Sequence, residues 1–288
     1  MAYTVDAAFT QYYDNINLSG DFRALASARR DHIFNLLANR FHVVDAFAGG
    51  SIPKYTALRN HADLDIFVVL HYRKHCEGNR PSQVLQDMRT ALAAKPGVRR
   101  NGQAVTLTYA SFPDVDVVPV FFTSHDGMRY ADSLFLNVPD MNTETWIRSM
   151  PQAHAGKIEA AAAELGANFR RVIKFVKHWN WKHGDLLRSF HIETLALATL
   201  DSTKLTDLPW AMCMFFKDIS DRILMPSYYE GDRIDEYLTA SDRANLNTRL
   251  KLLKDQSNAA WASGYLGMSE DAINKWHIIF GNEFPTYG

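Results

Sequence analysis

The chain has 288 residues, of which 47% are hydrophobic, so it is long enough for one large domain or two smaller ones with apolar cores. Lysine and arginine number 31 against 32 for aspartate and glutamate, which gives a formal net charge of -1. This balance excludes the strong basic field of proteins that bind long nucleic acids without sequence preference, so we expect no long nucleic acid as a partner.

The cysteines and the apolar segments indicate the cellular compartment. Cys76 and Cys213 are far apart and form no Cys-x-x-Cys pair, which argues against a disulfide framework and a zinc module. The first residues show no basic region followed by an apolar run, and no segment approaches the roughly 18 apolar residues of a membrane span. We therefore expect a soluble, cytoplasmic protein that does not contact membranes.

The first predicted elements surround a glycine turn. Residues 22–41 place apolar side chains at helical intervals with basic residues between them, which predicts an amphipathic helix. Residues 42–48 are typical of a short β-strand that ends at Gly49-Gly50-Ser51, and we predict that Ser51 caps a short helix there. A second strand is predicted over residues 63–70.

The character of the chain then changes along its length. A helix is predicted over residues 82–94, followed by strands over 103–110 and 114–121, where Pro119 indicates a sheet edge or a bulge. From about residue 155 all patterns are helical. We predict an α/β region with a mixed sheet and then an all-helical region. The boundary is expected within residues 139–155, so that domain 1–150 includes an N-terminal bracing helix and domain 151–288 is helical.

Two acids interrupt the apolar strand over residues 63–70. Side chains two positions apart on a strand project from the same face, so Asp63 and Asp65 share one small site. Two unpaired carboxylates there would repel each other, and a divalent cation removes that cost. Asp116 lies in another acid-bearing apolar strand, and three carboxylates suit two Mg²⁺ or Mn²⁺ ions.

The glycine turn supplies the second half of the predicted site. Gly50 lets the backbone approach a ligand closely, and Ser51 offers a hydroxyl and amides to a phosphate group. Carboxylates that bind metal beside a phosphate-binding turn favour nucleotidyl transfer.

These residues resemble the DNA polymerase β-like nucleotidyltransferases, whose pattern is Gly-Ser, Asp-x-Asp and a third Asp on a later strand. Within that superfamily, "DVDVVPVF" is similar to the third-acid strand of oligoadenylate synthetases and cGAS/DncV-like nucleotidyltransferases (CD-NTases). The helical region adds Lys177 and Trp179 in "VIKFVKHWN" and Ser189 and Glu193 in "RSFHIETLAL". Residues 272–285 resemble the C-terminal element of bacterial CD-NTases, so the resemblance spans most of the chain from residue 48 to 285.

The resemblance implies a polymerase β-like lobe, a helical lobe and an active site in the cleft between them. Lys177 and Ser189 would contact the donor triphosphate, and Phe190 would stack on a base. Nucleoside triphosphates (ATP, GTP, CTP or UTP) would be joined into a cyclic oligonucleotide, a second messenger in bacterial anti-phage (CBASS) signalling. A downstream effector would respond to this product, and regulatory or conjugating CBASS proteins are expected partners, including an enzyme that would conjugate Gly288.

Several residues leave alternatives open. Asp114 lies two positions before Asp116 and competes with it for the role of third acid, although the apolar run that directly follows favours Asp116. Lys174 and Lys177 could both be solvated charges on a helix, and Phe190 could be a core residue. Asn168 could contact a base edge or start a helix.

Histidines offer less. The cluster of His71, His75 and Cys76 has no evident fourth ligand, which favours a surface loop over a metal site, and His61 is expected to be structural.

Two other functions compete with the cyclase. One is transfer of a single nucleotide to an RNA, a protein or a small molecule, which would require an added acceptor. The other is a nucleotide-binding regulator without catalysis, against which the complete set of acids argues.

Overall fold

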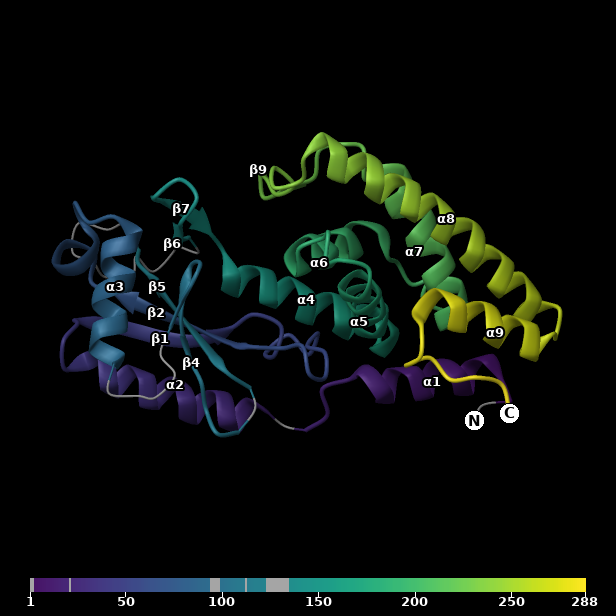
Figure 1. The fold of residues 1–288 in the computed structure, drawn as a ribbon, viewed down its shortest axis with the longest axis horizontal. Coiled ribbons are helices and arrows are strands. Elements are labelled where there is room, and N and C mark those ends of the chain that lie inside the picture. The colour runs from purple at the N-terminus through teal and green to yellow at the C-terminus, as the bar shows by residue number, and fades with distance from the viewer. Residues whose placement is uncertain (1–2, 21, 94–98, 112, 123–134) are drawn as a thin grey trace. The chain divides into compact units, whose positions relative to one another are not determined.

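We describe the protein from a computed structural model, which describes residues 3–20, 22–93, 99–111, 113–122 and 135–288. The packing of the chain defines two compact units (Figure 1). The sheet unit comprises residues 20–55 and 61–156, and the helical unit comprises residues 1–19, 56–60 and 157–288. The predicted division of the chain into domains 1–150 and 151–288 stays a prediction.

The sheet unit contains a mixed five-stranded sheet in the order β1-β2-β5-β4-β3. Among the described strand pairs of this sheet, β2–β5 is parallel and the others are antiparallel. The elements of this unit are α2 (Phe22–Ala38), β1 (Val43–Gly49), β2 (Leu64–Leu70), the π-helix η1 (Tyr72–Cys76), α3 (Pro81–Leu92), β3 (Arg99–Asn101), β4 (Ala104–Leu107), β5 (Val115–Val120), β6 (Leu136–Asp140) and β7 (Thr145–Ser149).

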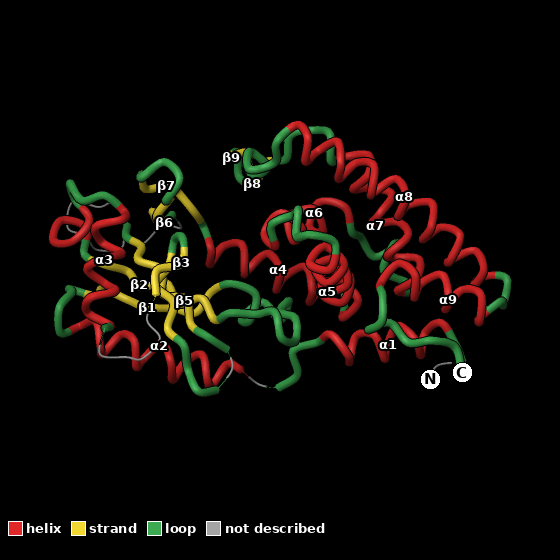
Figure 2. The backbone as a smooth tube through the Cα atoms, in the orientation of Figure 1, coloured by secondary structure: helices red, strands yellow, loops and turns green. Residues whose placement is uncertain are grey.

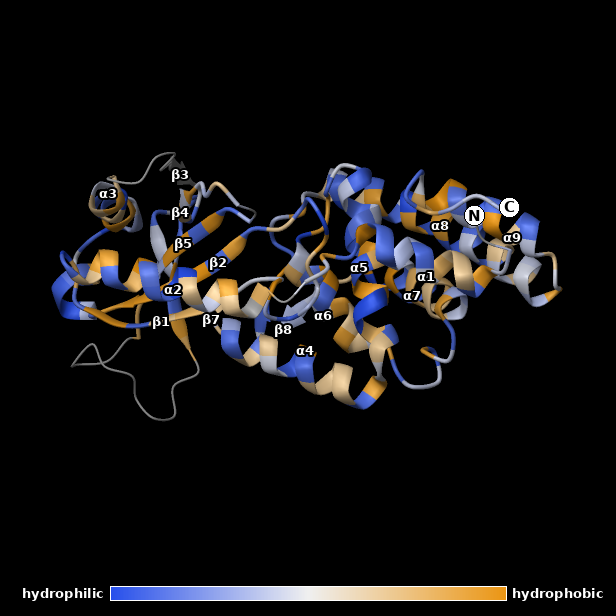
Figure 3. Cartoon of the chain, turned by 90° about the horizontal axis from the view of Figure 1, so that it is seen from below, coloured by the Kyte–Doolittle hydropathy of each residue, from blue (hydrophilic) through white to orange (hydrophobic). Residues whose placement is uncertain are grey.

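The two faces of this sheet are covered differently. Helix α2 packs on β1 and β2, α3 packs on β3, β4 and β5, and the two helices touch each other. The opposite face carries a cluster that includes Val69, Val118 and Leu136, and it contains no described residue of either helix. Strands β2 and β5 are coloured as largely hydrophobic in Figure 3. Apolar burial on both faces therefore fixes the two central strands.

Two local predictions in this unit are wrong. No helix follows Ser51: the segment forms a bend and a turn, in which the Tyr55 amide donates to the Ile52 carbonyl at 3.0 Å. Pro119 does not mark a sheet edge, because β5 lies between β2 and β4. The β4 ladder pairs with residues 115–117 only, so the missing amide of Pro119 costs no bond to β4.

The helical unit is built around long helices, as the sequence predicts (Figure 2). A hairpin of two strands with two residues each interrupts them, and the sequence did not predict it. The elements are α1 (Val5–Ile16), α4 (Pro151–Leu165), which begins in the sheet unit, α5 (Ala167–Lys182), α6 (Ser189–Thr199), α7 (Leu208–Arg222), β8 (Tyr228–Tyr229), β9 (Asp232–Arg233), α8 (Ala240–Tyr265) and α9 (Ser269–Phe280).

An aromatic core joins the two ends of the chain in the helical unit. Phe9 on α1 lies edge-on to Trp276 on α9, with ring centroids 5.1 Å apart, and Tyr12 stacks on Phe175 of α5 at 4.8 Å. The inserted segment 56–60 belongs to the same unit: Leu58 is buried in this core and pairs with Asn17 in a β-bridge. None of the described helices combines the length and hydropathy that crossing a membrane requires.

Candidate active site

The sheet register brings two of the predicted acids side by side. Asp65 on β2 is the direct partner of Asp116 on β5. Partners in register on neighbouring strands project from the same face, so both carboxylates lie on one side of the sheet. Asp63 is exposed and precedes the first residue of β2 by one position, and its negative charge acts on Asp65. The structure therefore pairs Asp65 with Asp116 and leaves Asp63 within electrostatic reach of Asp65.

The Asp65 carboxyl is held in an unfavourable setting for a negative charge. Its pKa rises from 3.8 to about 7, first because burial desolvates the carboxylate and then because Asp116 and Asp63 repel it. Lys54 acts in the opposite direction and lowers this pKa. A second charge within reach of a half-buried carboxylate is typical of functional sites rather than of a stabilising core.

The two rivals for the third acid have different surroundings. Asp116 accepts a short hydrogen bond from the hydroxyl of Thr106, its register partner on β4. Asp114 accepts from the Thr108 hydroxyl and from the Tyr109 amide, both at 3.3 Å, and so closes the connection between β4 and β5. This difference favours Asp116, and the assignment stays a prediction.

The carboxylates fit divalent metal by chemistry more than by preformed geometry. Among the described residues, no three His, Cys, Asp or Glu side chains converge closely enough to hold a metal ion as they stand. However, carboxylate oxygens are the ligands that Mg²⁺ and Mn²⁺ prefer, and burial with repulsion from Asp116 and Asp63 raises the pKa of Asp65, so its charged form needs a further counter-charge. A cation between Asp65 and Asp116 would supply it.

The glycine turn lies directly against this carboxylate. Gly50 has φ +71°, and a Cβ added there would lie 1.7 Å from Oδ2 of Asp65. Only glycine combines that backbone conformation with so close an approach. Ser51 follows, half-buried, in the bend after β1. The sequence reading missed Lys54 three positions later, because a single lysine in a turn carries no distinctive pattern.

Lys177 is buried in an ion pair within the helical unit. Its Nζ donates to Oε1 of Glu193 at 2.7 Å and to the Thr56 hydroxyl at 3.0 Å, and Thr56 donates to the same Glu193 oxygen at 2.7 Å. The side chains of Lys177 and Glu193 are 5% and 0% exposed. Lys177 is therefore not a solvated surface charge, and its contact with a nucleotide phosphate stays a prediction.

Ser189 and Phe190 form the exposed first turn of α6. Phe190 is 37% exposed, so the alternative that it belongs to the core is wrong. Its ring contacts Tyr229 of the hairpin β8–β9, with centroids 5.2 Å apart and planes at 79°. Trp179, by contrast, is a core residue.

The remaining polar candidates have structural partners. Lys174 is buried, donates to Asn17 and lies 5.3 Å from the Tyr13 ring centroid, so it is not solvated either. Burial lowers its pKa to about 8. Asn168 lies at the start of α5 and donates to the Leu205 carbonyl at 3.2 Å. This hydrogen bond is consistent with a structural role for Asn168 at the start of α5.

The histidine segment is not a plain surface loop. Residues 72–76 form the π-helix η1, in which Cys76 is buried. The Nε2 of His75 accepts the His42 amide at 2.8 Å, and the rings of His42 and His71 lie 4.9 Å apart. These contacts tie η1 to the start of β1.

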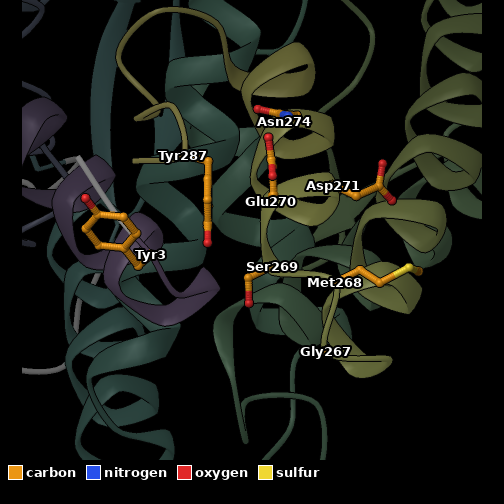
Figure 4. Close-up of a pocket in the computed structure, with 8 residues that line it drawn as sticks. All are labelled: Tyr3, Gly267, Met268, Ser269, Glu270, Asp271, Asn274 and Tyr287. Atoms are coloured by element: carbon orange, nitrogen blue, oxygen red, sulfur yellow. The ribbon is translucent and has the colours of Figure 1, made fainter.

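An open pocket in the helical unit contains none of the predicted site residues. It lies beside the first turns of α9, with Tyr3 and Tyr287 on its wall (Figure 4). Glu270 and Asp271 also line it, and the nearest cation to Asp271 is Lys275, which already forms an ion pair with it. A triphosphate would meet like charge here, so this pocket is a poor nucleotide site.

Comparison with known proteins supports the same class of enzyme. Residues 3–161 match the family of the Second Messenger Oligonucleotide or Dinucleotide Synthetase domain. A protein of Bacillus cereus (strain VD146) described as a probable cyclic nucleotide synthase is 23% identical over 337 aligned positions, covering 100% of this chain and 99% of that protein.

Solved structures show the same fold across nearly the whole chain. The structure of Escherichia coli MS115-1 CdnC with ATP has a TM-score of 0.72 at 18% identity and covers 97% of this chain and 98% of that one. A further structure of CdnC is a complex with HORMA-deltaN. Vibrio cholerae DncV, a cyclic AMP-GMP synthase, has a TM-score of 0.67 at 14% identity, covering 99% and 98%.

The chain belongs to the Second Messenger Oligonucleotide or Dinucleotide Synthetase family. It is a nucleotidyltransferase of the CD-NTase class, with a mixed-sheet lobe followed by a helical region. The predicted family, fold class and enzyme class are thus confirmed. The roles of individual site residues stay predictions.

Replacing Asp65 by Asn should stabilise the metal-free protein in a pH-dependent way. Because the folded-state pKa of about 7 exceeds the usual 3.8, the wild type loses stability as pH rises between these values. We expect Asp65→Asn to exceed the wild type by about 1–3 kcal/mol in free energy of unfolding at pH 8 and to match it near pH 4. Urea unfolding in EDTA measures this, and a difference that does not change with pH would contradict it.

Gly50→Ala should destabilise the sheet unit by about 2–4 kcal/mol, because strain at positive φ adds to a clash with the Asp65 carboxylate. Gly78→Ala is the matched control: its φ is +75° and nothing lies within 4 Å of the added Cβ. The control should lose only about 1 kcal/mol. Chemical unfolding compares the two variants, and equal losses would show that the approach to Asp65 is not the constraint.

Lys177→Met should cost about 3–5 kcal/mol of stability, since Glu193 would remain buried without its counter-charge. Lys182→Met, on the same helix but in a partly exposed pair with Glu283, should cost at most about 1 kcal/mol. The double variant Lys177→Met, Glu193→Gln should regain much of the loss. A double-mutant cycle by denaturant unfolding tests this, and additive effects would refute the buried pair.

Proposed function

We propose that this enzyme synthesises a cyclic oligonucleotide from nucleoside triphosphates by nucleotidyl transfer that depends on two Mg²⁺ or Mn²⁺ ions. The observation that carries the proposal is the in-register pair Asp65 and Asp116 beside the Gly50 turn, in a chain of this synthetase family. Asp63, Asp65 and Asp116 would hold the metal ions. When bound, such ions lower the pKa of an attacking hydroxyl and stabilise the leaving pyrophosphate.

Each bond of the product would form by the same exchange. A ribose hydroxyl of one nucleotide attacks the α-phosphate of another, the hydroxyl proton leaves to solvent or a carboxylate, and pyrophosphate departs. Gly50 and Ser51 would bind phosphate through backbone amides and the serine hydroxyl. Ser189, at the N-terminus of α6, would bind the donor triphosphate together with Lys177. Phe190 would stack on the donor base. The last transfer would close the ring.

We also propose that the product is a second messenger of bacterial anti-phage (CBASS) signalling and activates a separate effector. Two findings support a regulated enzyme: the family comprises synthetases of second messengers, and one structure of the similar CdnC contains HORMA-deltaN. By this analogy a partner protein would bind the present enzyme as well.

The test is incubation of the purified protein with ATP, GTP, CTP and UTP and either Mg²⁺ or Mn²⁺, followed by phosphatase digestion and mass spectrometry. A cyclic product resists phosphatase, and EDTA should abolish its formation. The double variant Asp63→Ala, Asp65→Ala should make none. A linear or acceptor-linked product, or product made only when RNA, protein or a small molecule is added, would favour transfer of a single nucleotide.

Asp116→Asn and Asp114→Asn separate the two candidates for the third acid. We expect Asp116→Asn to lower the rate of product formation by about 100-fold or more, because losing a metal ligand should cost at least as much as losing its outer-shell partner. Asp114→Asn should act on stability and change the rate only a few-fold, since its carboxylate closes a loop. The reverse order of effects would assign the third acid to Asp114.

A further inference from the structure

A tight hairpin lies beside the residue proposed to stack on the donor base. Strands β8 and β9 pair Tyr228 with Arg233 and Tyr229 with Asp232. Glu230 and Gly231 join them with φ values of +51° and +88°, the two positive values that a two-residue type I′ turn requires. Because successive strand residues point to opposite faces, Tyr228 and Tyr229 face different ways.

The Tyr229 ring and the Phe190 ring form a corner. Their planes meet at 79° with centroids 5.2 Å apart, in the edge-to-face arrangement. Phe190 directly follows Ser189, the proposed phosphate ligand, and it is 37% exposed. A planar base that stacks on one of these rings would present its edge to the other. Tyr228 is 60% exposed and has no described ring contact.

Hydrogen bonds from the buried His191 side chain fix the base of the hairpin to α6. His191, one residue after Phe190, contacts the Tyr237 hydroxyl through Nδ1 at 2.9 Å and the Ser227 hydroxyl through Nε2 at 3.0 Å. Ser227 directly precedes β8, and Tyr237 lies a few residues after β9. A single side chain of α6 therefore contacts residues on both sides of the hairpin, one before β8 and one after β9.

A buried charge cluster stiffens the same base. The Asp235 carboxylate is 0% exposed, accepts hydrogen bonds from the Ser227 amide at 2.9 Å and from Arg233 at 2.8 Å, and forms an ion pair with Arg243 at 2.8 Å. At the other end of the hairpin, Lys157 forms an ion pair with Glu230 and lies 5.0 Å from the Tyr229 ring centroid. Contacts at the base and at the turn of the hairpin thus restrict where the Tyr229 ring can lie.

We propose that Tyr229 is the second wall of the donor base site, where it and Phe190 together bind the nucleobase of a nucleoside triphosphate. This inference rests on the proposed function, because the triphosphate is assigned there to Ser189 and the N-terminus of α6. The hairpin β8–β9 is then a specificity element, whose fixed position sets the space next to Phe190. The expected ligand is a planar, aromatic base attached to a polyphosphate, and the base would contact the rings of Phe190 and Tyr229.

The test separates base binding from phosphate binding. Dissociation constants are measured by calorimetry with Mg²⁺ for the α,β-methylene analogues of ATP, GTP, CTP and UTP, which cannot undergo transfer, and for inorganic tripolyphosphate. For the analogue that the wild type binds most tightly, Tyr229→Ala should raise the dissociation constant about 3- to 10-fold, within the range for loss of one edge-to-face aromatic contact. The constant for tripolyphosphate should change less than about two-fold by the same reasoning.

Matched variants control for structural effects. Tyr229→Phe keeps the ring and should bind like the wild type, and Tyr228→Ala removes the neighbouring exposed ring and should also change nothing. Tyr229→Leu keeps apolar volume without the aromatic face, so it replaces the alanine variant if that variant does not fold. Thermal unfolding of each variant identifies such a failure before any binding is measured.

The outcomes are distinguishable. Equal weakening of analogue and tripolyphosphate, no weakening of either, or the same loss in Tyr228→Ala would each overturn the role of Tyr229. If the wild type binds the analogues no better than tripolyphosphate, the base site is absent while the phosphate site stands. If the wild type binds neither, the proposed function fails together with this inference.

Discussion

The repulsion between Asp65 and Asp116 is the constraint on which the sheet unit depends. Two carboxylates in register on adjacent parallel strands cannot both be charged without cost, and burial of the Asp65 carboxyl together with this repulsion raises its pKa to about 7. The sheet tolerates this cost because the other residues of both strands are apolar and largely buried, with helices on one face and a hydrophobic cluster on the other. The acidic pair is therefore built into two strands whose other residues are apolar and largely buried.

The position of the Asp65 carboxylate also constrains the glycine turn, because the turn lies against it. The same stretch of chain continues into residues 56–60 of the helical unit. Gly50 lies so close to the Asp65 carboxylate that no side chain fits, and Lys54 places the nearby positive charge. Two residues further on, Thr56 already belongs to the helical unit, where it donates to Glu193 beside Lys177. One short stretch thus carries both the backbone that approaches the Asp65 carboxylate and a hydrogen-bond partner of the buried Lys177–Glu193 pair. A change in this stretch would act on both groups of residues.

Most of the described helices and the strands β1, β2, β4 and β5 could be predicted, because apolar periodicity is a local property. Helix α1 and the short strands β3, β6 and β7 were not predicted. The register that joins Asp65 to Asp116 could not be predicted, since it depends on the pairing of distant segments. The helix predicted at Ser51 is absent because a residue that can cap a helix does not by itself make the following residues helical. The burial of Lys174 and Lys177 escaped prediction because their partners, Asn17, Thr56 and Glu193, come from other elements. Tyr229 lies on a hairpin too short to give a strand pattern.

Several buried polar contacts of the helical unit involve residues in the first turns of α6. Glu193 points inward to Lys177 and Thr56, while His191 points to the hairpin base that Asp235 and Arg243 fix. Apolar contacts would bury α6 as well, but they would leave its rotation and axial position loosely defined. Hydrogen bonds of fixed geometry do define them, and full satisfaction makes such a network rigid. Ser189 and Phe190 remain on the exposed side of the same turn. The buried charges thus orient an exposed helix start, and the loss of one partner alone would destabilise the unit because the other would remain buried without its counter-charge.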